Sequence, residues 1–276
     1  MSSLLIHSMA EFAPIILQCL ADAKARHIVE IGAEYGGMSL CLAQYCHHAD
    51  GTLVSIDPAA RTEFLVWSEK TDCVHHIAQP SLMALPDIPA ADAWVIDGDH
   101  NYYTVFNELL VTFQKSVNAC TPYLAFVHDI SWPCARRDFY YAPDTIPPEY
   151  LHPHSYEAGV TLNNSGVLHQ RGLRGEGQFA IALHEGGPRN GVLSAVEDFL
   201  SHMRAKGTDL VFAHIPAVFG LGVLFDAEAD WAEIVAGSLL PYHCNDLIAR
   251  MELNRLMNYL AVIDWQDREN ERLAYG

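Results

Sequence analysis

The sequence contains few basic residues: 16 lysines and arginines stand against 34 aspartates and glutamates, for a formal net charge of −18. Nucleic acids and anionic membranes bind proteins through a basic face, so we expect neither to be the main partner. This charge does not exclude a small anionic substrate held in a local basic pocket.

Long apolar runs and paired cysteine motifs are also missing. No uncharged apolar stretch is long enough to cross a bilayer, and the N-terminus has neither a basic start nor a small-residue cleavage site. The seven cysteines are scattered, with no C-x-x-C pair. We therefore predict a cytoplasmic protein with reduced thiols.

The 276 residues, half of them apolar, suffice for one large folded domain, which we place over 1–276. Helical spacing of apolar residues predicts a helix over 8–25 and a helical tail over about 244–273. The stretch over about 131–178 has little periodicity and many prolines, glycines and aromatic residues. An insertion of that length is typical of a functional lid.

Short apolar strands alternate with helical segments over the first 130 residues. This alternation predicts an α/β fold with a doubly wound, mostly parallel sheet, closed by a C-terminal antiparallel pair. The expected strands are His27–Ile31, Thr52–Ile56, Cys73–Ala78, Ala93–Ile96, Tyr123–Val127, Asp209–His214 and Leu221–Phe225, with a further short strand at Phe179–Leu183.

The stretch HIVEIGAEYGGMS (His27–Ser39) is a strand, a tight turn and a helix start. Its spacing E-x-G-x-x-x-G resembles motif I of the class I S-adenosylmethionine-dependent methyltransferases, which have a Rossmann-like, seven-stranded sheet. It is not the G-x-G-x-x-G of dinucleotide enzymes, because no third glycine falls at the required offset. The resemblance implies that Gly32, Ala33 and Gly36 approach the methionine part of the cofactor and that Glu30 organises the loop. The plainer alternative is a turn glycine with a helix-capping carboxylate.

The ends of the next strands supply further cofactor positions in this resemblance. Asp57 ends the second strand, where a carboxylate can accept both ribose hydroxyls. Gln79 and Ser81 follow the third strand, where the adenine is usually bracketed. For Asp97, at the end of the fourth strand, the resemblance implies both a cofactor contact and a catalytic role. For Asp57 the alternative is a solvated carboxylate before a proline turn.

The sequences D-G-D-H (Asp97 to His100) and H-D (His128, Asp129) place carboxylates and imidazoles at two neighbouring strand ends. Clustered carboxylates repel one another unless a cation offsets their charge. Oxygen ligands favour Mg²⁺ or a similar hard ion, whereas histidines also admit Mn²⁺ or Zn²⁺. The alternative is a hydrogen-bonded cluster that only orders the strand ends.

In these residues the chain resembles the metal-dependent O-methyltransferases of bacterial natural-product pathways, related to the macrolide-sugar methyltransferases and the cephalosporin hydroxylase-like family. The resemblance implies Asp97, His128 and Asp129 as metal ligands and His100 as the base that removes the substrate proton. The chain departs from the family at His128, where Glu or Asp is usual. A vicinal diol, as on a sugar or catechol, would chelate such a metal best.

The segment that follows, WPCARRDFYYAPDTIPPEY, combines aromatic and basic residues directly after the predicted metal pair. We predict substrate contacts there, since arginine grips anionic groups or stacks on rings. Pairing of the arginines with Asp138 or Asp144 is the alternative. The predicted substrate residues are Trp132, Arg136, Arg137, Tyr140 and Tyr141.

Together these features predict a metal-assisted, S-adenosylmethionine-dependent O-methyltransferase that acts on a small molecule such as a sugar or natural product. A metal-independent enzyme that methylates nitrogen or a carboxylate is the nearest alternative. A non-catalytic cofactor-binding scaffold is another. The helical tail could pack on the core or mediate a homo-oligomer.

Overall fold

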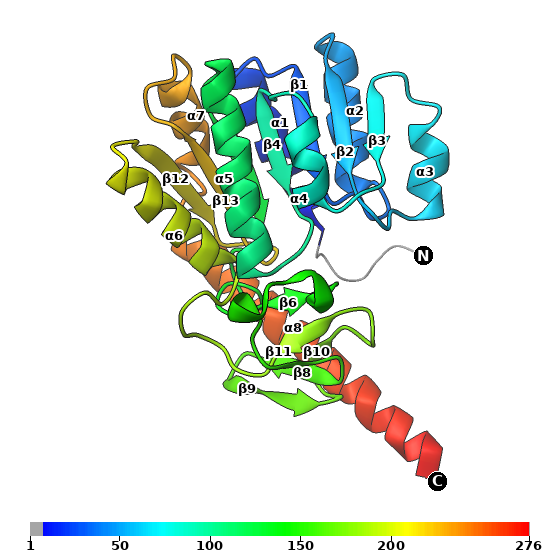
Figure 1. Cartoon of the computed structure of the whole chain (residues 1–276). Helices are drawn as coiled ribbons and strands as arrows, with labels where there is room; N and C mark the ends of the chain where they lie inside the picture. Colours follow the sequence, from blue (N-terminus) through cyan, green and yellow to red (C-terminus); the bar gives the residue numbers. More distant parts are fainter. Residues whose placement is uncertain (1–7, 276) are drawn as a thin grey trace.

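The fold is built on one large sheet, described in this computed structural model over residues 8–275 (Figure 1). The ends of the predicted domain, residues 1–7 and 276, lie outside the described part. Seven strands cross the sheet in the order β12-β13-β5-β4-β1-β2-β3. β1 to β5 run parallel, and β13 pairs antiparallel with both β5 and β12. The strands are β1 (His27–Ile31), β2 (Thr52–Ile56), β3 (Val74–Ile77), β4 (Ala93–Ile96), β5 (Leu124–His128), β12 (Leu210–Ile215) and β13 (Leu221–Asp226).

This topology confirms the predicted Rossmann-like sheet with its C-terminal antiparallel pair. The central strand β4 is buried along its whole length, as expected for a parallel strand that is covered on both faces. Two apolar clusters lie on the two faces, one around Trp94 and Leu109 and the other around Ile16 and Leu42. Within residues 8–275 no helix is long and apolar enough to cross a membrane.

Helices cover both faces of the sheet (Figure 1). α5 packs extensively on α6, and α1 contacts both α2 and α7. The predicted N-terminal helix is split into a 3₁₀ turn (Met9–Phe12) and α1. The helices are α1 (Ala13–Asp22), α2 (Gly37–His48), α3 (Thr62–Ser68), α4 (Ser81–Ala84), α5 (Tyr102–Ala119), α6 (Val192–Ala205), α7 (Ala232–Leu239) and α8 (Asp246–Tyr275).

The segment between β5 and α6 is a folded unit of two small sheets, and it extends past the 131–178 expected for a lid. Their strand orders are β10-β8-β9 and β6-β11-β7. β11 holds the predicted strand at 179–183, but it pairs with β6 and β7 and does not join the main sheet. The small strands are β6 (Phe139–Tyr140), β7 (His154–Ser155), β8 (Ala158–Thr161), β9 (Asn164–His169), β10 (Leu173–Arg174) and β11 (Ala180–Ala182).

Candidate functional site

The turn after β1 brings the glycine loop directly against the end of β4. Gly32 has φ +89°, and a Cβ atom there would lie 2.1 Å from the carbonyl oxygen of Asp97. Gly36 is also left-handed, with φ +83°, and is the residue before α2. Only glycine allows this close approach without strain. The loop predicted to hold the cofactor and the predicted reaction centre are therefore adjacent.

Glu30, near the end of β1, connects the start of the glycine loop to α2 and β2 through hydrogen bonds. Its buried Oε2 accepts hydrogen bonds from the hydroxyls of Ser39 in α2 (2.6 Å) and Ser55 in β2 (2.7 Å). Burial raises the pKa of Glu30 to about 7 despite these two donors. The buried Oε1 has no partner, which is the kind of orphaned acceptor that a ligand or water in the loop would satisfy.

Asp57 also shapes this loop. Its Oδ2 accepts the backbone N–H groups of Ala33 and Glu34, both at 2.9 Å, and its Oδ1 accepts that of Ala59 at 2.7 Å. A carboxylate has about four acceptor positions, so three backbone donors leave little capacity for two ribose hydroxyls. Here the carboxylate predicted for the ribose is engaged by the loop predicted for the methionine.

The two residues predicted near the adenine differ from each other. Gln79 is exposed. Ser81 is buried, and its hydroxyl donates to Oε1 of Glu108 at 2.5 Å. Burial raises the pKa of Glu108 to about 8, and its Oε2 is buried without a partner. No motif in the sequence marks Glu108, which lies inside an ordinary helical pattern.

The ends of β4 and β5 bring three donor groups together. Asp97, His100 and Asp129 each offer one ligand atom, and these atoms lie within 4.8 Å of one another. The Nδ1 atom of His100 is 3.2 Å from Oδ2 of Asp129. The cluster can hold a divalent cation, or it can work as a histidine base oriented by a carboxylate.

His128 does not offer a lone pair to that cluster. Its Nδ1 lies 3.0 Å from Oδ1 of Asp97 and 3.4 Å from Oδ2 of Asp129, and its Nε2 lies 2.8 Å from the carbonyl oxygen of Val218. A carbonyl oxygen only accepts, so Nε2 carries a hydrogen, and an ionised carboxylate requires the same of Nδ1. Burial opposes the resulting charge, but the two carboxylates outweigh it and hold the pKa of His128 well above its usual value. In this geometry His100, and not the predicted ligand His128, is the histidine that could join the two carboxylates at a metal ion.

Asp99, the remaining carboxylate of D-G-D-H, serves the start of α5. It is half-buried and accepts hydrogen bonds from the side chains of Asn101 (2.6 Å) and Thr104 (3.3 Å). Burial raises its pKa. Asn101 in turn caps α5 by accepting the N–H of Thr104, as its sequence position predicts.

The predicted substrate arginines are committed elsewhere. Arg136 forms a two-pronged pair with Glu197 at 2.6 and 2.7 Å. Arg137 is buried and donates to the carbonyl oxygens of Ala182, Ser165 and Gly166. Neither pairs with Asp138 or Asp144, the partners considered from sequence. Acceptors within the chain therefore satisfy the guanidinium groups of both arginines. This argues against the prediction that the two arginines contact a substrate.

The predicted aromatic residues are also divided. Tyr140 is fully buried and donates to Asp138 at 2.9 Å, and the half-buried Trp132 packs at 6.4 Å from the ring of Phe219. Tyr141 is 49% exposed, and its ring centroid lies 5.7 Å from that of His100. Phe179, which no sequence signal marked, lies edge-on to Tyr141 at 5.5 Å. Of the predicted substrate residues, Tyr141 is the one beside the cluster.

A sequence profile described as a methyltransferase domain matches residues 29–130. No curated protein sequence matches the chain. Among solved structures, the chain is similar to an O-methyltransferase from Bacillus cereus in complex with SAH (12% identity, TM-score 0.47, covering 82% of this chain and 85% of that one). It is also similar to the O-methyltransferase TomG from Streptomyces achromogenes in complex with SAM (14%, 0.46, 80% and 82%). A third is the 1,6-didemethyltoxoflavin-N1-methyltransferase of Burkholderia thailandensis (11%, 0.41, 80% and 78%).

The profile covers the glycine loop, on which the resemblance to motif I rests, and also Asp57, Asp97, His100 and Asp129. Residues 29–130 therefore carry a methyltransferase domain, and the prediction of an S-adenosylmethionine-dependent methyltransferase is confirmed.

Proposed function

We propose that the chain transfers a methyl group from S-adenosylmethionine to a hydroxyl oxygen of a small molecule, with a divalent cation at the ends of β4 and β5. One observation carries the proposal. Asp97, His100 and Asp129 present three ligand atoms within 4.8 Å of one another, and a Cβ on Gly32 would touch the backbone of Asp97. The acidic cluster thus adjoins the loop that would hold the cofactor.

For the cofactor, the residues present fit the methionine end better than the ribose end. The unpartnered Oε1 of Glu30, next to the loop of Ala33 to Gly36, suits a ligand at this loop. Asp57 can accept one ribose hydroxyl while it keeps its three backbone donors. Gln79 is exposed and would be free to contact the adenine. The hydroxyl of Ser81, in contrast, already donates its hydrogen bond to Glu108.

For the metal, the donor set of two carboxylates and one imidazole suits Mg²⁺ or Mn²⁺. Such an ion, when bound, lowers the pKa of a coordinated hydroxyl and so prepares the oxygen for methyl transfer. Asp97 and Asp129 would supply oxygen ligands and His100 its Nδ1. His128, donating to both carboxylates, would hold them in place, as residues behind metal ligands commonly do.

For the substrate, the exposed ring of Tyr141 and the neighbouring Phe179 favour a flat ring that bears a hydroxyl. Two adjacent hydroxyls, as on a catechol or a sugar, would chelate the cation. Neither Arg136 nor Arg137 is available to bind an anionic group, so we propose an uncharged acceptor.

A second candidate is methyl transfer without a metal. The contact of 3.2 Å between His100 and Asp129 is also that of a base with its orienting carboxylate. His128 already places a positive charge beside Asp97 and Asp129, which reduces the need for a cation. In that case Nε2 of His100 removes the proton from the acceptor, which could also be a nitrogen.

We place the reaction in the cytoplasm, in keeping with the seven free cysteines, and with no nucleic acid or membrane as partner. A homo-oligomer through the C-terminal helix is part of the same proposal.

Calorimetry with S-adenosylmethionine tests the cofactor. Binding by the parent and at least tenfold weaker binding by Asp57→Ala are expected. No heat with the parent would reject both the proposed methyl transfer from S-adenosylmethionine and a scaffold that binds this cofactor. A screen of catechol-like and sugar acceptors with labelled cofactor then tests the metal: EDTA should abolish transfer and Mg²⁺ or Mn²⁺ should restore it. Transfer that survives EDTA would favour the metal-free route through His100.

A further inference from the structure

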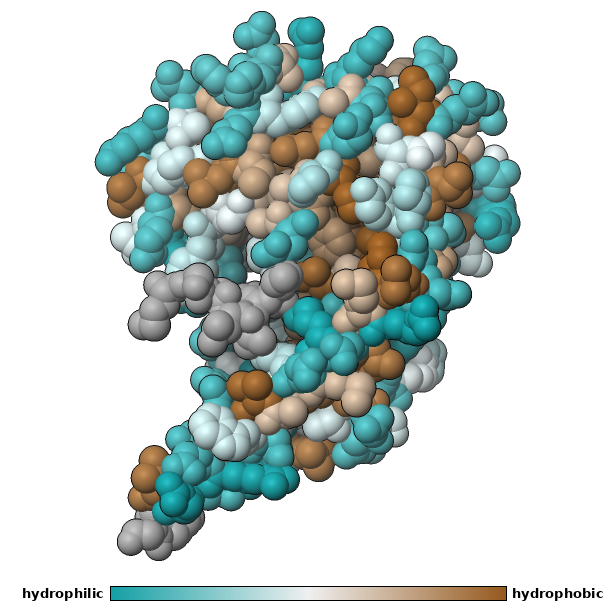
Figure 2. Space-filling view, turned by 180° about the vertical axis from the view of Figure 1, so that it is seen from behind, coloured by the Kyte–Doolittle hydropathy of each residue, from teal (hydrophilic) through white to brown (hydrophobic). Residues whose placement is uncertain are grey.

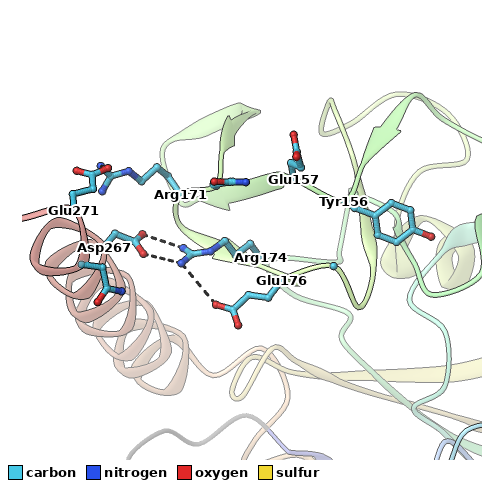
Figure 3. Close-up of a pocket in the computed structure, with 10 residues that line it drawn as sticks. Tyr156, Glu157, Arg171, Arg174, Glu176, Asp267 and Glu271 are labelled. Carbon is cyan, nitrogen blue, oxygen red and sulfur yellow. Dashed lines mark hydrogen bonds and ion pairs between the residues drawn. The ribbon is translucent and has the colours of Figure 1, made fainter. Parts of the chain in front are cut away.

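The 30-residue helix α8 packs one of its faces on its own subunit. On that face Leu256 is buried, Glu252 accepts the N–H of Phe219 at 3.0 Å, and Asp267 accepts two hydrogen bonds from Arg174 at 2.7 and 3.0 Å. Figure 3 shows the last contact at the edge of a hollow of about 430 Å³ between α8 and the small sheets. Arg174 also pairs with Glu176 there. The inner face of α8 is thus occupied by polar and apolar contacts within the chain.

The opposite face of α8 carries a row of apolar side chains that are 45 to 66% exposed. Figure 2 shows apolar side chains among polar ones over this side of the molecule. An apolar row of this length on a water-exposed helix marks an interaction surface. Its members are Leu247, Met251, Met257, Val262 and Trp265.

Three members of the row, Leu247, Met251 and Trp265, follow the alternating three- and four-residue spacing of a helix that packs against another helix along its length, and Met257 and Val262 flank that line. The positions at this spacing are 247, 251, 254, 258, 261 and 265, all exposed. At a rise of 1.5 Å per residue they extend over about 27 Å. Asn254 and Asn258 form the polar centre of this line, with apolar residues toward both ends.

We propose that this face binds the same face of a second copy of the chain, with the two α8 helices antiparallel about a two-fold axis near Leu256. Residues equally distant from Leu256 then face each other. Leu247 meets the partner's Trp265, Met251 meets the partner's Ala261, and Asn254 meets the partner's Asn258. Each such contact occurs twice, as a two-fold interface requires.

The residues that flank this line complement each other in the same alignment. Arg250 lies opposite the partner's Asp264, Ile248 lies opposite the partner's Val262, and Met257 meets the same residue of the partner on the axis. Opposite charges beside the seam favour one orientation of two helices. A parallel alignment would instead place Arg250 against the partner's Arg250.

Existing contacts of these charged residues do not oppose the pairing. Asp264 pairs with Arg268 on its own helix at 2.8 Å and with Arg171 of the insertion at 3.9 Å, and the side chains of Asp264 and Arg268 are more than half exposed. Exposed pairs of this kind contribute little, so Asp264 can share its charge with the partner's Arg250. The central layer of Asn254 with the partner's Asn258 would fix the register, as a single polar layer does in paired helices.

A second copy fits this face better than an anionic membrane, because the chain carries a net charge of −18 and a membrane of the same sign repels it. The face itself balances Arg250 against Asp264 and is therefore neutral toward a copy of itself. The inference is independent of the proposed reaction, because it is tested by mass and not by turnover.

Light scattering during size-exclusion chromatography at micromolar concentration tests the interface. The parent should have about twice the 30.6 kDa mass of the chain. Met257→Lys, which places two like charges on the axis, should give a monomer with an unchanged circular dichroism spectrum. Ile234→Lys, at an exposed position on α7, is the matched control and should remain dimeric. A monomeric parent, or a Met257→Lys variant that stays dimeric, would overturn the proposal.

A charge exchange tests the orientation. Arg250→Asp alone and Asp264→Arg alone should each weaken dimerisation roughly tenfold, since each creates two like-charge contacts. The double variant restores opposite charges at both contacts and should dimerise like the parent. A double variant as weak as the single ones would reject this antiparallel register.

Discussion

The Nε2 atom of His128 lies 2.8 Å from the carbonyl oxygen of Val218, in the turn between β12 and β13. Val218 has φ 44°, a left-handed conformation that β-branched residues rarely adopt. His128 donates a hydrogen bond to this turn, and Glu252 of α8 accepts the N–H of the next residue, Phe219. A single buried imidazole thus connects Asp97 and Asp129 at the strand ends with a strained turn.

His128→Asn should lower the free energy of unfolding by about 3–5 kcal/mol, because it removes the buried cation between Asp97 and Asp129. Urea unfolding followed by fluorescence measures the change. His169→Asn, at a side chain that is 70% exposed, should unfold like the parent and is the control. If His128→Asn unfolds at the parent's urea concentration, the contacts of His128 do not stabilise the fold.

Glu108 should make the protein less stable as the pH rises. Its pKa is about 8 in the folded chain and about 4.5 when unfolded, so between these values the folded state binds the extra proton. The free energy of unfolding then falls with rising pH, by up to about 1.4 kcal/mol per pH unit from this group. Glu108→Gln keeps a neutral side chain at every pH. The variant should match the parent near pH 4.5 and exceed it in stability at pH 8.

Melting temperatures of both proteins between pH 4.5 and 8 test this expectation, and Glu149→Gln, at an exposed position, provides the control. The comparison isolates Glu108 because Glu30, whose pKa is also raised, contributes equally to both proteins. A constant difference between Glu108→Gln and the parent across this range would contradict the protonation of Glu108.

The two arginines of the insertion should differ sharply in their effect on stability. Arg137→Ala leaves three carbonyl acceptors unpaired around a buried site, which should cost about 3 kcal/mol or more. Arg136→Ala removes a half-exposed pair with Glu197 and should cost about 1 kcal/mol or less. Denaturant unfolding measures both. An Arg136→Ala variant of parental stability with a raised acceptor KM would reinstate Arg136 as a substrate contact.

The sequence predicted the sheet and the glycine loop well because both depend on local patterns. Apolar strands ending at Glu30, Asp57, Asp97 and His128 specify a parallel sheet whose carboxyl ends meet at one edge. The same patterns could not locate the small sheets of the insertion. Strands of two residues such as β6 and β10 are too short to show periodicity.

The roles within the site were harder to predict, because they depend on where distant backbone groups lie. Val218, whose carbonyl oxygen fixes the protonation of His128, is 90 residues away in sequence. The acceptors of Arg137 come from β9 and β11, which had not been placed next to it. From residue type alone, His128 was predicted to bind a metal and Arg137 to bind a substrate. In the structure, both side chains form hydrogen bonds with backbone carbonyl oxygens of distant segments.

Tyr141→Ala tests the proposed contact between the ring of Tyr141 and the acceptor. Loss of an aromatic partner costs about 1.5 kcal/mol, so KM for a ring-bearing acceptor should rise roughly tenfold with a smaller change in kcat. Calorimetric binding of S-adenosylmethionine should be unchanged, since the ring of Tyr141 packs on the rings of His100 and Phe179. Tyr156→Ala, at the exposed ring in the hollow beside α8 (Figure 3), is the control and should keep the parent's KM. A Tyr141→Ala variant with the parent's KM would place the acceptor on another side of the cluster.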